Sequence, residues 1–232
     1  MGAHEDAERV DSAWRTLVDH LVTDRTLRTP RIIEAFRTTP RSAFVPPGMR
    51  ESAVTLDAAL PIGEGQTVSQ PTTVAIMLER TDPRPGEKVL DIGTGSGWQA
   101  ALLARIVGAR RDVGLTTGHV YTVERIPTLA KAAQQRFQET GIANITALVG
   151  DASRGLPSSA PFDVIIAAAE SSCVPPDLVD ELAAGGRLLQ PISGMGLRVV
   201  RKDTVGNVTV QDVPGFVFVP LVQSGEEPKN VS

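Results

Sequence analysis

Cysteine is nearly absent from this sequence of 232 residues, since Cys173 is the single one. An internal disulfide is therefore excluded, and the composition is compatible with a reducing compartment, so a cytoplasmic protein is expected. The first residues are charged and polar, and no apolar run approaches the length of a membrane span. The sequence thus predicts neither a signal peptide nor a membrane helix.

Histidine and excess positive charge are also scarce. The three histidines, His4, His20 and His119, lack the spacing of metal ligands, so no metal site is expected. The formal net charge is −4 and the basic residues do not form a long run, which argues against nucleic acid as the main partner. With 41% hydrophobic and 22% charged residues, the chain has the composition of a globular protein, long enough for one α/β domain with an appendage.

From about residue 85 onward, predicted strands and helices alternate. Strands are expected at 88–92, 119–124, 145–149, 162–167 and 187–190, and helices at 98–107, 127–139 and 176–182, the last one stopped by Gly185 and Gly186. Residues 109–118 are expected to form a long, mobile loop. This alternation predicts an α/β fold with a doubly wound, mostly parallel, Rossmann-like sheet.

The flanking regions follow different patterns. An amphipathic helix is predicted at 11–22, and Thr29 and Pro30 mark the start of a second helix. Near the end of the chain, residues 198–201 and 208–213 are expected to form a hairpin around Gly206 and Asn207, and residues 216–222 to add a final strand.

The segment 89–101, VLDIGTGSGWQAA, carries the strongest signal for a ligand. A strand, a glycine-rich turn and a helix start follow one another, as in nucleotide-type pockets. The spacing G-x-G-x-G differs from the dinucleotide fingerprint, and Asp91 would repel a phosphate at close range. A cationic ligand without phosphates, such as S-adenosyl-L-methionine, is favoured. A dinucleotide, or a turn that holds no ligand, is the alternative.

Two further acids are expected at the carboxyl ends of the predicted strands, where open α/β sheets bind ligands. Glu124 ends the second strand and is placed to accept hydrogen bonds from two ribose hydroxyls; the alternative is a solvated acid. Asp151, with its neighbour Ala152, is placed to receive an adenine amino group; the alternative is an aspartate that forms a turn or caps a helix.

Several segments together resemble one enzyme family. VLDIGTGSGWQAALLA, VYTVER, LVGDASRGLP, FDVIIAAA and GGRLLQPI are similar, in this order, to protein-L-isoaspartate O-methyltransferases. The upstream segment PIGEGQTVSQPTTVAIML is the more specific match, because that family carries a G-Q-T-[I/V]-S-x-P motif before its cofactor domain. The resemblance runs from about Trp14 to Val222.

The resemblance implies roles for individual residues. Ser69 corresponds to the catalytic serine that binds the substrate carboxylate. Gln66, Thr67 and Val68 of the same loop are assigned to substrate binding. A hydroxyl suits this role, because a carboxylate is already ionised at pH 7 and needs positioning rather than a base. Alternatively, Ser69 caps the helix that follows it. The residues assigned to cofactor binding are Asp91, Gly93, Thr94, Gly95, Gly97, Glu124, Asp151 and Ala152.

The implied reaction is methyl transfer from S-adenosyl-L-methionine to the free carboxylate of an L-isoaspartyl residue, which leaves S-adenosyl-L-homocysteine and starts the repair of damaged proteins. The implied organisation is one compact unit, with N-terminal helices and the catalytic segment in 1–84, the cofactor-binding core in 85–195 and strands that complete the sheet in 196–232. A monomer that acts on isoaspartyl proteins or peptides is expected.

Three positions depart from the family pattern. Glu64 stands where an uncharged, often aromatic, residue is common, Thr72 where His or Tyr is common, and Trp98 where Tyr is more common. These departures leave cofactor binding intact and concern the substrate. The alternatives are therefore a carboxyl methyltransferase that acts on an aspartate of a dedicated peptide in natural-product biosynthesis, or a module that binds the cofactor without catalysis.

Overall fold

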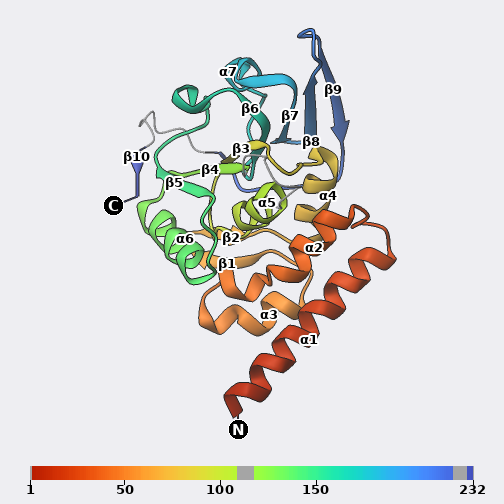
Figure 1. Cartoon of the computed structure of the whole chain (residues 1–232), viewed down its shortest axis with the longest axis vertical. Helices are drawn as coiled ribbons and strands as arrows, with labels where there is room; N and C mark the ends of the chain where they lie inside the picture. Colours follow the sequence, from red (N-terminus) through yellow and green to blue (C-terminus); the bar gives the residue numbers. More distant parts are fainter. Residues whose placement is uncertain (1, 109–117, 222–228, 232) are drawn as a thin grey trace.

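The computed structural model describes residues 2–108, 118–221 and 229–231, and its centre is an eight-stranded sheet (Figure 1). The strand order is β10-β5-β4-β3-β6-β7-β8-β9. The strands are β3 (Lys88–Ile92), β4 (His119–Glu124), β5 (Ile145–Val149), β6 (Phe162–Ala167), β7 (Leu182–Ile192), β8 (Gly196–Lys202), β9 (Val208–Val213) and β10 (Lys229–Asn230). The pairs among β5, β4, β3, β6 and β7 are parallel, whereas β8, β9 and β10 are antiparallel additions at the two edges.

The central parallel strands β3 and β6 are buried on both faces, as their nearly continuous apolar sequences predict. Neighbouring residues of one strand face two different hydrophobic clusters: Val89 lies in one and Leu90 in the other, and both are fully buried. The helices that connect the strands are α5 (Trp98–Gly108), α6 (Pro127–Glu139) and α7 (Pro176–Asp180), with the short 3-10 helix η3 (Pro157–Ser159) before β6. The predicted doubly wound, Rossmann-like α/β sheet is thus confirmed.

The N-terminal region is helical and packs at one end of the molecule (Figure 1). It contains α1 (Gly2–Thr23), α2 (Pro30–Thr38), η1 (Arg41–Phe44), η2 (Pro47–Met49) and α3 (Arg50–Thr55). Trp14 of α1 stacks on Phe36 of α2, and Trp98 of α5 meets both rings edge-on, with centroids 5.8 and 5.5 Å away. This aromatic cluster fixes the helical region against the helix that follows the glycine loop.

A short hairpin and one helix connect the helical region to the sheet. The hairpin consists of β1 (Leu60–Gly63) and β2 (Gln66–Val68), and α4 (Pro71–Thr81) follows directly. Ser69 lies in the two-residue link between β2 and α4, so its backbone is bounded by regular structure on both sides.

The structure corrects two sequence predictions. Gly185 and Gly186 do not end a helix at residue 182, because α7 ends at Asp180 and both glycines lie inside β7. The described part of the predicted final strand at 216–222 forms no strand. It forms one isolated bridge, between Pro220 and Glu170, outside the named strands. The Glu170 amide donates to the Val219 carbonyl at 2.8 Å and the Leu221 amide donates to the Glu170 carbonyl at 2.7 Å, so this stretch pairs with a single residue of the loop after β6.

The remaining predicted strands and helices are confirmed, although α1 begins earlier than expected and β7 and β8 are longer. The loop predicted at 109–118 lies, apart from Gly118, outside the described residues. No described helix combines the length and the hydrophobicity that a membrane crossing requires.

Candidate functional site

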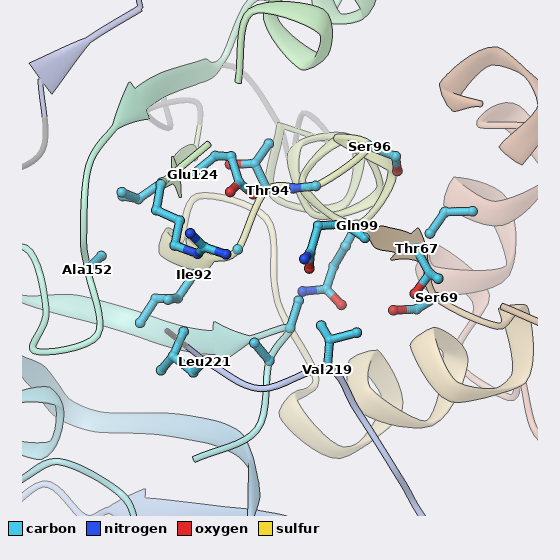
Figure 2. Close-up of a pocket in the computed structure, with 18 of the residues that line it drawn as sticks. Thr67, Ser69, Ile92, Thr94, Ser96, Gln99, Glu124, Ala152, Val219 and Leu221 are labelled. Carbon is cyan, nitrogen blue, oxygen red and sulfur yellow. Dashed lines mark hydrogen bonds between the residues drawn. The ribbon is translucent and has the colours of Figure 1, made fainter. Parts of the chain in front are cut away.

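A cleft opens at the carboxyl ends of β3, β4, β5 and β6, and it encloses about 810 Å³ out to its solvent-open mouth. The turns after these four strands line one part of it, the hairpin link around Ser69 a second part, and the tail segment at Val219 a third (Figure 2). A parallel sheet brings residues that are far apart in sequence to one edge. The cleft is therefore a natural place for a ligand that touches all three parts.

The glycine loop follows β3 and requires its glycines for two different reasons. Gly93 and Gly97 have φ values of +90° and +88°, which side chains other than hydrogen rarely allow. A Cβ on Gly97 would also lie 2.9 Å from the ring of Phe137 on α6. Gly97 therefore serves the packing of the loop against α6, while Gly93, Thr94 and Gly95 face the cleft.

Asp91 lies beneath this loop and is fully buried. Its carboxylate accepts hydrogen bonds from Gln99 Nε2 at 2.7 Å and from Thr122 Oγ1 at 2.6 Å. Burial raises the pKa of Asp91 to about 6, and the nearby charge of Glu124 also raises it, whereas the two hydrogen bonds act in the opposite direction. Among the described residues no cation lies within ion-pair distance of Asp91, so its negative charge is not neutralised by a side chain.

Gln99 connects this buried acid to the cleft. Its amide nitrogen is held by Asp91, which leaves the carbonyl oxygen as the atom available to a ligand. Gln99 lines the cleft between the glycine loop and the hairpin link (Figure 2). A carbonyl oxygen whose amide is bonded to a carboxylate is polarised toward a positively charged group.

Glu124 at the end of β4 has only 6% of its surface exposed, so the alternative of a solvated acid is wrong. One carboxylate oxygen accepts from the Gly95 amide at 2.9 Å and the other from the Ile126 amide at 3.0 Å. The carboxylate is thereby fixed at the edge of the cleft, with acceptor capacity left on each oxygen for a diol.

Asp151 and Ala152 follow β5 and line the same cleft. The carboxylate of Asp151 accepts from the Ser153 amide at 2.8 Å, so the predicted turn geometry is present. That bond involves one oxygen of the carboxylate. The turn fixes Asp151 and does not exclude a ligand contact.

The hairpin link presents two hydroxyl groups. Thr67 and Ser69 lie two residues apart and line the cleft together (Figure 2), whereas Val68 between them is 3% exposed. The Ser69 hydroxyl forms no hydrogen bond with any described residue. The N-cap of α4 is Gln70, and the capping bonds come from Asp57, which accepts from the Thr72 amide at 2.8 Å and the Thr72 hydroxyl at 2.6 Å. Ser69 therefore does not cap the helix.

Most predicted site residues meet in this cleft. Its walls include Gln66, Thr67, Val68, Ser69, Gly93, Thr94, Gly95, Glu124, Asp151 and Ala152, whereas Asp91 and Gly97 lie behind the wall. The cleft is also lined by residues that the sequence motifs did not indicate: Gln99, Ala168, Ala169 and Ile92. The position of the two alanines directly after β6 was a usable signal, because it is again the carboxyl end of a parallel strand.

The donor set fits S-adenosyl-L-methionine. A buried carboxylate without a cationic partner suits its positive charge, and a fixed acid at the end of the second parallel strand suits a ribose diol. Among the described residues, no group of three or more His, Cys, Asp or Glu side chains is arranged to hold a metal ion.

Comparison with known proteins identifies the family of this chain. The family model for protein-L-isoaspartate(D-aspartate) O-methyltransferase matches residues 12–226. A protein-L-isoaspartate O-methyltransferase of Hyperthermus butylicus is 42% identical over 221 residues, which cover 94% of this chain and 91% of that protein. A protein-L-isoaspartate O-methyltransferase of Staphylothermus marinus is 43% identical over 218 residues, which cover 92% of this chain and 96% of that protein.

The fold also matches solved structures. A Plasmodium falciparum protein, described as a protein-L-isoaspartate O-methyltransferase in complex with S-adenosyl-L-homocysteine, superposes with a TM-score of 0.78 over 91% of this chain and 99% of that chain, at 20% identity. That likeness shows the fold, and the family model shows the family. The chain therefore belongs to the protein-L-isoaspartate(D-aspartate) O-methyltransferase family.

Proposed function

We propose that this protein transfers the methyl group of S-adenosyl-L-methionine to the free α-carboxylate of an L-isoaspartyl residue in a protein or peptide. One observation carries the proposal: the Ser69 link and the glycine loop line the same cleft. Both segments match sequence motifs of the family. A methyl donor and an acceptor carboxylate bound at these two walls are thereby brought together.

The donor is held by the strand ends. Gln99 and the buried charge of Asp91 receive its ammonium group, Glu124 receives the ribose hydroxyls, and Asp151 with Ala152 receives the adenine. When bound, S-adenosyl-L-methionine supplies a methyl group on a cationic sulfur that leaves as a neutral thioether. Bringing the two reactants together in a fixed geometry accounts for a large part of such a rate enhancement.

The acceptor needs no base, because its carboxylate is ionised at neutral pH. The hydroxyl of Ser69 donates to one carboxylate oxygen, and the other oxygen forms the new bond to the methyl carbon while the carbon–sulfur bond breaks. A neutral hydroxyl holds the carboxylate by a hydrogen bond and leaves its negative charge unpaired. A cation in direct contact would neutralise that charge and make the oxygen a weaker nucleophile. The resulting methyl ester carries a better leaving group than the free carboxylate. The peptide nitrogen therefore attacks the ester carbonyl, forms the ring C–N bond and expels methanol, and hydrolysis of this succinimide returns part of the residue to normal aspartate.

We also propose a cytoplasmic monomer. A single cysteine is compatible with a reducing compartment. Light scattering coupled to size exclusion, with and without S-adenosyl-L-homocysteine, tests the oligomeric state. A dimer that forms at the working concentration of the enzyme contradicts the proposal.

A pair of peptides tests the function. One contains an L-isoaspartyl residue and the other a normal aspartyl residue in the same sequence, and methyl transfer to each is measured with labelled donor. We expect transfer to the isoaspartyl peptide and little to its twin. Transfer to the aspartyl peptide alone, or to neither while the donor still binds, contradicts repair and leaves the dedicated-peptide enzyme or the non-catalytic module, respectively.

A further inference from the structure

Arg41 in η1 is a fully buried cation. Among the described residues no carboxylate lies within ion-pair distance of its guanidinium, although Asp57 is close enough to act on it electrostatically. Burial lowers the pKa of Arg41 to about 10, and the charge of Asp57 acts in the opposite direction. The group therefore still carries its positive charge at neutral pH. A buried charge without a counterion is costly, so its hydrogen bonds decide what it does.

Within the described part of the chain, the guanidinium donates hydrogen bonds to main-chain carbonyls and to no side chain. Three of them belong to the end of α3 and the residues after it: Ala53 at 3.0 Å, Leu56 at 2.9 Å and Ala58 at 2.8 Å. The fourth is the carbonyl of Ser69 at 3.0 Å. Nη1 donates to both Ala58 and Ser69, so one planar group joins the Ser69 link to the segment 53–58.

The segment 53–58 holds the other side of the same link. Asp57 accepts from the amide and the hydroxyl of Thr72, and also from Gln70 Nε2 at 3.0 Å. Ser69 lies between these two attachments. Its carbonyl is bound by Arg41 on one side and the residues after it are bound by Asp57 on the other, while its hydroxyl stays available to the cleft. The arrangement holds the backbone of the link from both sides and leaves the Ser69 hydroxyl open to the cleft.

Arg41 also contacts the cleft wall through Trp98. The guanidinium carbon lies 5.9 Å from the centre of the Trp98 ring, and Trp98 lines the cleft and donates from Nε1 to the Thr39 carbonyl at 3.0 Å. Arg41 itself does not line the cleft. Its positive charge is therefore one layer behind the wall at which an anionic acceptor is expected, where low exposure to solvent reduces screening.

We propose that Arg41 is a positioning residue for methyl transfer. This role rests on the proposed function. Arg41 orients Ser69 through the Ser69 carbonyl and provides a positive potential behind the acceptor site without contacting the acceptor. Lysine cannot replace it, because a single ammonium does not span the four carbonyls that the planar guanidinium joins.

The test compares Arg41→Lys with Arg187→Lys. Arg187 is the control for loss of a buried guanidinium: it is 7% exposed and donates to main-chain carbonyls at Thr81, Asp82 and Asp163, but it lies outside the cleft wall. Unlike Arg41, it also donates to both carboxylate oxygens of Glu87 at 2.7 Å. For both variants the melting temperature, the dissociation constant of S-adenosyl-L-homocysteine, and kcat and KM for an isoaspartyl peptide are measured. We expect Arg41→Lys to reduce kcat/KM about 10- to 100-fold, because small displacements of a positioning group have effects of this size.

In the same variant the dissociation constant of S-adenosyl-L-homocysteine should stay within about twofold, since the donor site does not include Arg41. Arg187→Lys should lower the melting temperature and leave both kinetic constants unchanged. In Arg41→Ala, millimolar methylguanidinium should restore part of the activity, and it should not stimulate Arg187→Ala. Unchanged kinetics in Arg41→Lys, or an equal loss in Arg187→Lys, overturns the proposal.

A second measurement does not depend on the substrate. Hydrogen–deuterium exchange of the amides in residues 66–72 should accelerate about tenfold in Arg41→Lys and not in Arg187→Lys, because the link loses one of its two attachments. If the wild-type enzyme does not methylate the isoaspartyl peptide, the proposed function fails. Exchange at 66–72 then still decides whether Arg41 fixes the link, and unchanged exchange overturns the positioning role.

Discussion

The hydroxyl of Thr128, in the first turn of α6, donates a hydrogen bond to Oε1 of Glu64 at 2.9 Å. Glu64 occupies the tip of the hairpin β1–β2, with a φ of +54°. On the same hairpin, the Ile62 side chain lies next to Gly95, since a Cβ added at Gly95 would be 3.6 Å from Ile62 Cδ1. The hairpin thus lies across the glycine loop and is attached to α6 on the far side. This bond joins the segment that carries Ser69 to the helix that follows Glu124.

Loss of the Thr128–Glu64 hydrogen bond should make the cofactor exchange faster. Thr128→Val nearly keeps the shape of the side chain and removes the hydroxyl that donates to Glu64, so the hairpin tip is released from α6. We expect the dissociation rate of S-adenosyl-L-homocysteine to rise about two- to fivefold, which is the effect of one exposed hydrogen bond. Stopped-flow displacement measures it. The control is Thr16→Val, which removes an exposed hydroxyl bond on α1; equal rates in the two variants would show that the Glu64 bond has no part in exchange.

The charge of Glu64 should affect the choice of peptide. Glu64→Gln keeps an oxygen that can accept from Thr128 and removes the negative charge. We expect wild-type enzyme to prefer isoaspartyl peptides with lysine beside the target over those with glutamate, by about two- to fivefold in KM at low salt. The preference should disappear in Glu64→Gln and at high ionic strength. A preference that survives both changes must come from another group.

The sequence predicted the parallel core and most of the cleft because both follow from local patterns. Strand ends in a parallel sheet meet at one edge, so Glu124 and Asp151 could be assigned to one site without coordinates. The role of Arg41 could not be predicted in this way. It depends on main-chain carbonyls at residues 53–69, which carry no sequence signal, and on the path of three separate segments. The depth of Asp91 was equally invisible, because the motif gives its position along the chain and not its burial.

Asp91 should make donor affinity depend on pH. Its pKa in the folded protein, about 6, lies above the ordinary value of 3.8, chiefly because burial disfavours the charged form. The folded protein therefore binds this proton more readily than the unfolded chain. The contribution of Asp91 to stability is largest below pH 4 and is lost as the pH rises through 6. The ammonium group of S-adenosyl-L-homocysteine, which is the positive charge this ligand carries, favours the ionised form of Asp91, so affinity for the ligand should fall as the pH drops below 6.

Asp91→Asn separates these two effects. At pH 7.5 the ligand-free variant should melt a few degrees higher than wild type, because it no longer buries a charge. In a chain of this size, a gain of about 1 kcal/mol in the free energy of unfolding raises the melting temperature by about 2–4 °C. The affinity of the variant for S-adenosyl-L-homocysteine should be about tenfold or more lower and nearly independent of pH between 5 and 7. Calorimetry at three pH values measures both. A variant that binds as tightly as wild type at pH 7 would show that the donor does not sense this charge.

Two glycines of the loop should respond differently to alanine. A Cβ at Gly97 meets the Phe137 ring at 2.9 Å and φ is +88°, so Gly97→Ala should lower the free energy of unfolding by about 2–4 kcal/mol. At Gly95 φ is +52° and the nearest contact is an ordinary 3.6 Å, so Gly95→Ala should cost about 1–2 kcal/mol. Urea unfolding compares them. Equal losses would mean that packing against α6 does not set the requirement at Gly97.

Ser69→Ala tests the acceptor wall directly. The hydroxyl forms no hydrogen bond with a described residue, and Asp57 rather than Ser69 caps α4, so removal of the hydroxyl should leave the melting temperature unchanged. We expect kcat for an isoaspartyl peptide to fall about 10²- to 10³-fold, as when one preorganised donor is lost from an active site. The dissociation constant of S-adenosyl-L-homocysteine should stay within about twofold. Ser158→Ala, an exposed serine in η3, is the control. Full activity in Ser69→Ala would remove this hydroxyl from the mechanism and leave the fixed backbone of the link as the part that binds the acceptor.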